Sequence, residues 1–243
     1  MKADEVIPQR TLGLGLESGS GCSMASKESM ADRAYARLKR DIIEARLRPG
    51  TVLSDSALAE QYEMSRTPVR EAINNLRREG LVVVLPKRGT FVKPLDFGEI
   101  HDLYTLRTLV EPEAAVLASQ RSTEGELTEL EELSALSTDP DVEKLVLNER
   151  NSRLHVRIAE LSGISLLATT VRAIHEEIER CLNLRRELGR PYKAVNHGRL
   201  VDAIMTRDEV VIRSTALSGI ERARDHMMSV LTRHSGVAGE GDS

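Results

Sequence analysis

The feature that most constrains the fold is an ordered series of short patterns within residues 30–93. Three patterns place apolar residues three and four positions apart, which is typical of helices with one buried face. These positions are Tyr35, Leu38 and Ile42, then Leu58, Ala59 and Tyr62, then Val69, Ala72, Ile73 and Leu76. Two short β-branched runs follow. The order predicts three helices and a β-hairpin, which is the order of a winged helix-turn-helix.

Local signals set the expected boundaries of these elements. Ser54 is expected to cap the second helix, and Thr67 to cap the third, with Pro68 at its first position. Residues 81–84 and 90–93 read as two strands around a basic turn.

The chain beyond Asp96 has almost no strand signal, and we expect an all-α helical bundle there. Helical patterns cover six stretches, at about residues 96–120, 123–137, 140–162, 165–189, 192–206 and 208–234. Pro112 is expected to break or kink the first of them. The predicted fold class is therefore mainly α, with one small hairpin in the N-terminal domain.

Four segments are expected along the chain: a disordered tail over 1–28, a winged helix-turn-helix over 29–94, an all-helical effector-binding and dimerisation domain over 95–235, and a second disordered tail over 236–243. The first tail is rich in Gly and Ser and has no periodicity.

Charge and composition narrow the class of function. The net charge is −4, yet residues 30–93 hold 13 Lys and Arg against 8 Asp and Glu, while the remainder holds 21 against 30. This uneven distribution of charge along the chain suits a positively charged segment that faces phosphates. No apolar run reaches membrane-spanning length and no signal peptide is evident, so we expect a cytoplasmic protein without a membrane partner. Only Cys22 and Cys181 are present, so neither a disulfide scaffold nor a thiolate metal cluster is indicated.

The third helix carries a basic edge beside its apolar stripe. Arg66, Arg70, Asn74 and Arg77 are spaced by four, four and three residues, so they share one helical face. The N-terminal residues of a recognition helix reach base edges in the major groove, where Arg binds guanine. We expect Arg66 and Arg70 to read bases; the alternative is a solvated surface face.

Phosphate contacts are expected around this edge. Thr67 at the helix N-terminus is placed to contact a phosphate. Lys87 and Arg88 at the hairpin tip are expected to grip the backbone or enter a minor groove, and Gly89 permits the turn.

The chain resembles the GntR family of regulators. The resemblance rests on Leu47-x-Pro-Gly50, Leu53-Ser54, Leu58-Ala59, the segment Ser65-Arg-Thr-Pro-Val-Arg-Glu-Ala72, Leu76, Glu79-Gly-Leu81 and Pro86-x-Arg-Gly89. The second region resembles the FCD-type helical domain of the FadR subfamily through Leu103-Tyr-x-Leu-Arg107, Glu111, Ala114-Ala115 and residues 155–167. The resemblance implies a homodimer on a partly palindromic double-stranded operator. It also implies a small-molecule effector, often a carboxylic acid.

Within the DNA-binding motif the resemblance extends the expected contacts to Ser65 and Ser56. Many relatives carry an Arg at the position of Ser56, and that Arg touches DNA. Ser56 has no charge but can still reach a phosphate, so operator sequence or affinity should differ.

The resemblance also points to a metal site, of which this chain retains only some of the ligand residues. Many relatives bind a divalent metal such as zinc through a carboxylate, a His four residues later and two further His about 22 residues apart. Here His155 and His197 match, but the carboxylate position is Asn151 and the last position is Gly219. We expect Asn151, His155 and His197 to line an effector pocket. A metal is not required, and a metal-free pocket is favoured over an incomplete site.

Arg107 is expected to bind an effector carboxylate. The alternative is a structural ion pair with Glu111, four residues later. His175 and His226 would join a metal site only if the register of the helical bundle differed from the family pattern. His101 and His234 are not grouped with other metal-ligand residues in the sequence.

The sequence favours a ligand-responsive regulator, with repression relieved by ligand as the default. A metal-dependent enzyme on the helical domain is the alternative. It is disfavoured because nucleophile-elbow, phosphate-loop and HExxH motifs are missing from the sequence.

Overall fold

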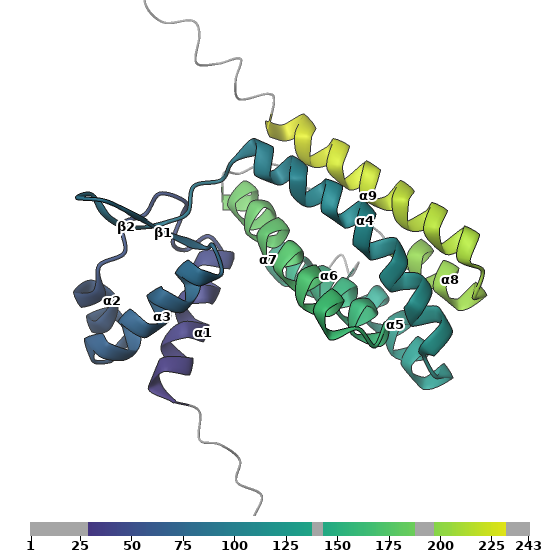
Figure 1. The fold of residues 1–243 in the computed structure, drawn as a ribbon, viewed down its shortest axis with the longest axis horizontal. Helices are drawn as coiled ribbons and strands as arrows, with labels where there is room; N and C mark the ends of the chain where they lie inside the picture. Colours follow the sequence, from purple (N-terminus) through teal and green to yellow (C-terminus); the bar gives the residue numbers. More distant parts are fainter. Residues whose placement is uncertain (1–28, 138–142, 188–196, 232–243) are drawn as a thin grey trace, which may run out of the picture.

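The computed structural model describes residues 29–137, 143–187 and 197–231 (Figure 1). Its N-terminal part contains α1 (Met30–Ile43), α2 (Asp55–Tyr62), α3 (Arg66–Arg78), β1 (Val82–Leu85) and β2 (Gly89–Val92). This confirms the three helices and the hairpin. Both expected tails lie outside the described residues.

Side-chain caps fix where α1 and α2 begin. Ser29 and Asp32 form a capping box on α1, and Ser54 accepts a hydrogen bond from the backbone N–H of Ala57. The expected cap at Thr67 is wrong, because Ser65 is the N-cap of α3. The helix therefore starts two residues earlier than predicted, and its first turn still tolerates the proline that follows Thr67.

One apolar core holds the N-terminal helices and the hairpin together. The predicted apolar stripes of all three helices contribute to it, along with residues of the hairpin. Its fully buried members include Leu38, Ile42, Val69, Leu76 and Val92. Their burial leaves the opposite face of α3 to solvent.

The hairpin is an antiparallel pair with Val82 opposite Val92 and Leu85 opposite Gly89. The N–H of Arg88 donates to the carbonyl of Leu85, which closes a β-turn at the tip. Lys87 has a φ of 62° inside this turn, and Gly89 has a φ of 113°, a region that favours glycine.

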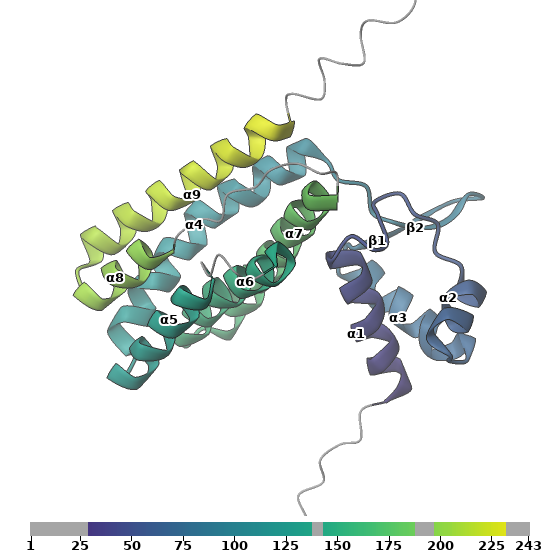
Figure 2. The ribbon, with the colours of Figure 1, turned by 180° about the vertical axis from the view of Figure 1, so that it is seen from behind.

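In the second part, all regular elements among the described residues are α-helices (Figures 1 and 2). They are α4 (Phe97–Arg121), α5 (Glu124–Leu136), α6 (Lys144–Leu161), α7 (Ser165–Glu187), α8 (Gly198–Thr206) and α9 (Glu209–Leu231). This confirms the all-α region. The expected starts near 140 and 192 fall in stretches that the structure does not describe.

Of the break or kink expected at Pro112, the break does not occur, because α4 continues through this residue. Pro112 is itself buried, and Tyr104, Ala114, Ala115 and Ala118 on the same helix are also buried. Packing along the whole length of α4 outweighs the backbone hydrogen bond that proline cannot donate. In both views α9 lies beside α4, and the two helices are in contact.

The two parts of the chain meet where α1 contacts α7. The side-chain amide of Asn183 donates to the carbonyl of Ile43 at 3.0 Å, and Arg180 donates to the carbonyl of Lys93 at 2.8 Å. Both α7 residues are buried. No helix among the described residues is long and apolar enough to cross a membrane.

Candidate functional site

The exposed edge of α3 presents the predicted basic residues. Arg66, Arg70, Asn74 and Arg77 are all exposed, while the opposite stripe is buried. Ser65 and Thr67 are also exposed at the start of the helix, and Ser65 makes no side-chain capping hydrogen bond. This leaves its hydroxyl available to an external partner.

Arg70 is engaged in a contact that the sequence did not reveal. Its Nε forms an ion pair with the carboxylate of Asp55, the first residue of α2. Ser56, the next residue, has its hydroxyl 3.0 Å from that of Ser54. The ion pair ties α2 to α3 and orients the Arg70 side chain, so that binding to a base requires the guanidinium to use its remaining donors or to leave Asp55.

The predicted residues of the hairpin tip are also accessible. Lys87, Arg88 and Gly89 are exposed, and the tip carries two positive charges. The structure thus leaves every predicted DNA contact open to solvent.

The second candidate site is a cavity of about 60 Å³ inside the helical part, lined by α4, α6, α7, α8 and α9. This volume is several times the roughly 10–15 Å³ that a cavity needs to hold a single water. The structure brings the predicted effector residues together here, since Arg107, Asn151, His155 and His197 all line the cavity. Gly219 lines it as well.

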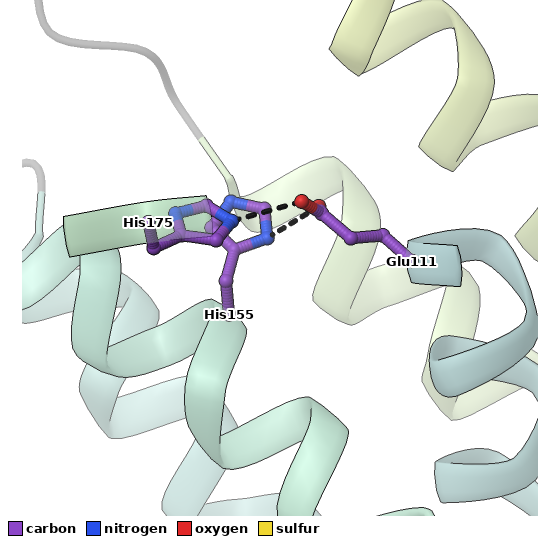
Figure 3. Close-up of side chains that lie close together, drawn as sticks. All are labelled: Glu111, His155 and His175. Atoms are coloured by element: carbon purple, nitrogen blue, oxygen red, sulfur yellow. Dashed lines mark hydrogen bonds and ion pairs between the residues drawn. The ribbon is translucent and has the colours of Figure 1, made fainter. Parts of the chain in front are cut away.

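A buried carboxylate organises the wall of this cavity. Glu111 accepts hydrogen bonds from Arg107, with Nε at 2.6 Å from Oε1 and Nη2 at 3.1 Å from Oε2. His155 Nδ1 lies 3.1 Å from Oε2, and His175 Nε2 lies 2.9 Å from Oε1 (Figure 3). All four side chains are buried. The ion pair considered for Arg107 is therefore present, and Arg107 lines the cavity at the same time.

Electrostatics at this cluster keep the charges on Glu111 and Arg107. Burial opposes ionisation of Glu111, but the charge of Arg107 and the contacts of His175 and His155 hold its pKa well below the usual value. Burial and the neighbouring His155 lower the pKa of His175 to about 3. Burial also lowers the pKa of His197 well below its usual value. His175 and His197 are therefore neutral at physiological pH.

Several buried polar atoms around the cavity lack a hydrogen-bond partner among the described residues. They are Nε2 of His155, Nδ1 of His175, Nε2 of His197 and Oδ1 of Asn151. The His155 ring stacks on His175 with centroids 4.2 Å apart and meets His197 edge-on at 4.7 Å. Unpartnered buried polar atoms are costly, so a water or a ligand that supplied their partners would stabilise this cluster.

Sequence reasoning missed the role of Glu111 and His175. Glu111 was considered as a residue of the FCD-type resemblance and as the ion-pair partner of Arg107. His175 was considered as a metal ligand only if the helix register differed from the family pattern. The two residues are 64 positions apart on α4 and α7. The sequence signal was the spacing of Glu111 four residues after Arg107, and this spacing does not specify a His partner.

The donor set does not suit a divalent metal ion. Within the described residues, the one group of His, Cys, Asp or Glu close enough to hold an ion is Glu111, His155 and His175. Both oxygens of Glu111 already accept hydrogen bonds from the guanidinium of Arg107, whose charge would repel a second cation. At the family-type positions, Asn151 offers a neutral amide and Gly219 offers no side chain.

Comparisons with known proteins agree with this architecture. Residues 30–92 match the model of the bacterial regulatory proteins of the gntR family, and residues 102–227 match that of the FCD domain. The Nta operon transcriptional regulator of Aminobacter aminovorans is 35% identical over 54% of this chain, which spans 63% of that protein. An uncharacterized HTH-type transcriptional regulator of Streptomyces ambofaciens is 29% identical over 79% of this chain and 85% of its own.

Among solved structures, E. coli McbR/YncC has a TM-score of 0.68 at 20% identity, over 84% of this chain and 99% of its own. This likeness concerns the fold alone. The two family matches together cover both parts of the chain and follow the helix-turn-helix and the helical bundle described above. The chain therefore belongs to the gntR family of bacterial regulatory proteins, as a transcriptional regulator that joins a helix-turn-helix DNA-binding domain to an FCD ligand-binding domain.

Proposed function

We propose that this regulator is a homodimeric repressor that leaves its double-stranded operator when a small anionic effector, of the carboxylate class, fills the cavity of the helical domain. The observation that carries the proposal is the position of α7. One residue of this helix, His175, hydrogen-bonds the cavity carboxylate Glu111, and the next, Glu176, forms a 2.9 Å ion pair with Lys39 of the DNA-binding domain.

Operator recognition is assigned to the exposed edge of α3. Arg66 and Arg70 read bases, and Ser65 and Thr67 contact phosphates at the helix N-terminus. Ser56 and the hairpin-tip residues Lys87, Arg88 and Gly89 add backbone contacts. Two copies of this surface in one dimer match two half-sites of a palindromic operator.

The charge of the cavity supports an anionic effector. Its lining contains the guanidinium groups of Arg107, Arg199 and Arg222, and the one acidic residue in that lining, within the described chain, is Glu111. Since Arg107 and Glu111 neutralise one another, Arg199 and Arg222 remain to attract a carboxylate.

Release follows from differential binding to two arrangements of the domains. The effector stabilises an arrangement in which α7 and α1 are displaced relative to the operator-bound form. The free energy of operator binding then becomes less favourable by the coupling free energy between the two sites. We propose that the protein acts by binding rather than catalysis. A regulator of this kind works where the chromosome lies, in the cytoplasm.

The test is selection of duplexes from a random-sequence DNA library, followed by anisotropy titration of the selected site against scrambled competitor. The Arg66→Ala/Arg70→Ala double variant should lose its preference for the selected site by about 100-fold or more, because each base contact is worth about 1–3 kcal/mol. Arg153→Ala removes an exposed charge from α6 and should retain the preference. A double variant with undiminished preference, or a wild-type protein that selects no duplex, contradicts the proposal.

A further inference from the structure

We infer that Asp55, on α2, is a positioning residue that sets which base Arg70 reads in the operator. Its carboxylate holds the guanidinium of Arg70 by Nε and leaves the two Nη groups to donate to a guanine. The inference rests on the proposed base contact of Arg70. It adds the residue that makes this contact selective for one base.

The start of α2 holds the carboxylate in place. Ser54 caps the helix by accepting a hydrogen bond from the N–H of Ala57, so Asp55 occupies the first helical position. A negative charge is favourable there, because the helix dipole is positive at its N-terminus. The side chain of Asp55 is 33% exposed, about half the exposed fraction of Arg70, at 64%. The partly buried carboxylate therefore restrains the exposed guanidinium, rather than the reverse.

The ion pair engages only part of the guanidinium. Asp55 accepts the hydrogen bond of Arg70 Nε, and Nη1 and Nη2 have no partner among the described residues. A guanidinium is planar and its donors have fixed directions, so the edge between Nη1 and Nη2 points away from the carboxylate. These two groups can donate together to O6 and N7 of guanine, whereas adenine presents a donor beside its N7. The restrained fork thus selects guanine.

The charge of Asp55 also disfavours a contact between Arg70 and the DNA backbone. An arginine bound to phosphate adds affinity for every sequence and carries no sequence information. A carboxylate beside the guanidinium repels a phosphate at that place, so it discriminates against backbone binding. Arg66, exposed on the same helix, has no ion pair within the described chain. Loss of Asp55 should therefore alter the base preference at the Arg70 position and spare the one at the Arg66 position.

The alternative role for the pair is structural, as a tie between α2 and α3. Exposed ion pairs contribute little to stability, so this role predicts a small change in thermal unfolding and an unchanged base preference. Base preference therefore separates the two roles.

The experiment uses the full chain and an operator selected from a random-sequence library. Each base pair is replaced in turn, symmetrically in both half-sites, and anisotropy titration gives the relative affinity at each position. Asp55→Asn removes the charge and keeps the shape of the side chain. At the position that Arg70→Ala also affects, the preference for guanine should fall about tenfold. Affinity for a scrambled duplex should rise severalfold, because Arg70 becomes free to bind phosphate.

Three further variants test how Asp55 acts. Glu60→Gln removes one exposed negative charge from the same helix and should leave every base preference unchanged. Asp55→Glu restores a carboxylate and should recover part of the guanine preference. The double variant Arg70→Ala/Asp55→Asn should show the same base preferences as Arg70→Ala alone, since Asp55 acts through Arg70. Thermal unfolding of each variant confirms that it is folded.

Two results would overturn the inference and leave the proposed function standing. One is an unchanged base preference in Asp55→Asn, and the other is a change of preference that persists in the Arg70→Ala background. If Arg70→Ala itself changes no base preference, the proposed base contact of Arg70 fails, and the inference fails with it.

Discussion

Replacing Glu111 by Gln tests the charge arrangement at the cavity most directly. The substitution keeps the shape of the side chain but removes the negative charge, which leaves the guanidinium of Arg107 buried without a counterion. The side chain of Arg107 is 5% exposed, so solvent screens little of the effect. Breaking a buried ion pair in this way costs about 3–5 kcal/mol of unfolding free energy.

A double-mutant cycle separates the pair from its surroundings. Arg107→Met should also destabilise the fold, because it leaves the carboxylate of Glu111 uncompensated. The double variant Arg107→Met/Glu111→Gln carries neither charge and should be more stable than the sum of the single changes implies. The difference should be about 2 kcal/mol or more, near the upper range for contacting residues.

Urea unfolding followed by far-ultraviolet circular dichroism measures these free energies at one fixed protein concentration. The pKa of Glu111 is lowered in the fold, so its stabilisation is present above the unfolded value of about 4.3 and is lost as pH falls below it. The difference in unfolding free energy between wild type and Glu111→Gln should thus be constant from pH 8 to pH 5 and should shrink in stronger acid. The buried ion pair is refuted if Glu111→Gln lowers the unfolding free energy by less than about 1 kcal/mol. It is also refuted if the effects of the two single substitutions simply add in the double variant.

Two further changes probe other buried or half-buried charges. Burial, aided by repulsion from Glu149 and Glu176, raises the pKa of Glu179 to about 7, so wild type loses stability as pH rises from about 4.3 to 7. Glu179→Gln should be more stable than wild type at pH 8 by on the order of 3–4 kcal/mol and equal to it at pH 4, as thermal unfolding at both pH values would reveal. Lys39 ion-pairs with Glu79 inside the DNA-binding domain and with Glu176 across the domain junction, and Lys39→Met should cost about 1 kcal/mol or less after solvent screening. It should also change the effector concentration that releases the operator; an unaltered release curve would contradict the proposed coupling.

The fold was predictable where its causes are local. The apolar stripe of α3 and the arginine edge opposite it follow from one helical period, and both were found as expected. The cap of α3 was misplaced because Ser65 and Thr67 are both good N-caps two residues apart. Pro112 does not end α4, because its cost is local, whereas the packing that outweighs it spans the whole of the helix.

The cavity was predictable only in part, because its contacts cross between helices. The family resemblance located Asn151, His155 and His197 in one place, and all three line the cavity. It could not show that Glu111 links Arg107 with two histidines, since the register between α4 and α7 is set by tertiary packing. The ion pair of Arg70 with Asp55 was hidden for the same reason.

The geometry of α7 explains how a small cavity can influence a distant domain. Ile178 and Leu182 line the cavity, while Arg180 and Asn183 contact backbone carbonyls on the DNA-binding side. At about 100° per residue, the first pair lies on a face roughly a quarter turn or more from the second. A close-packed helix moves as a unit, so a ligand that shifts one face must shift the other. Because the junction contacts reach Ile43 at the end of α1, any such shift is transmitted to a helix that packs directly against α3.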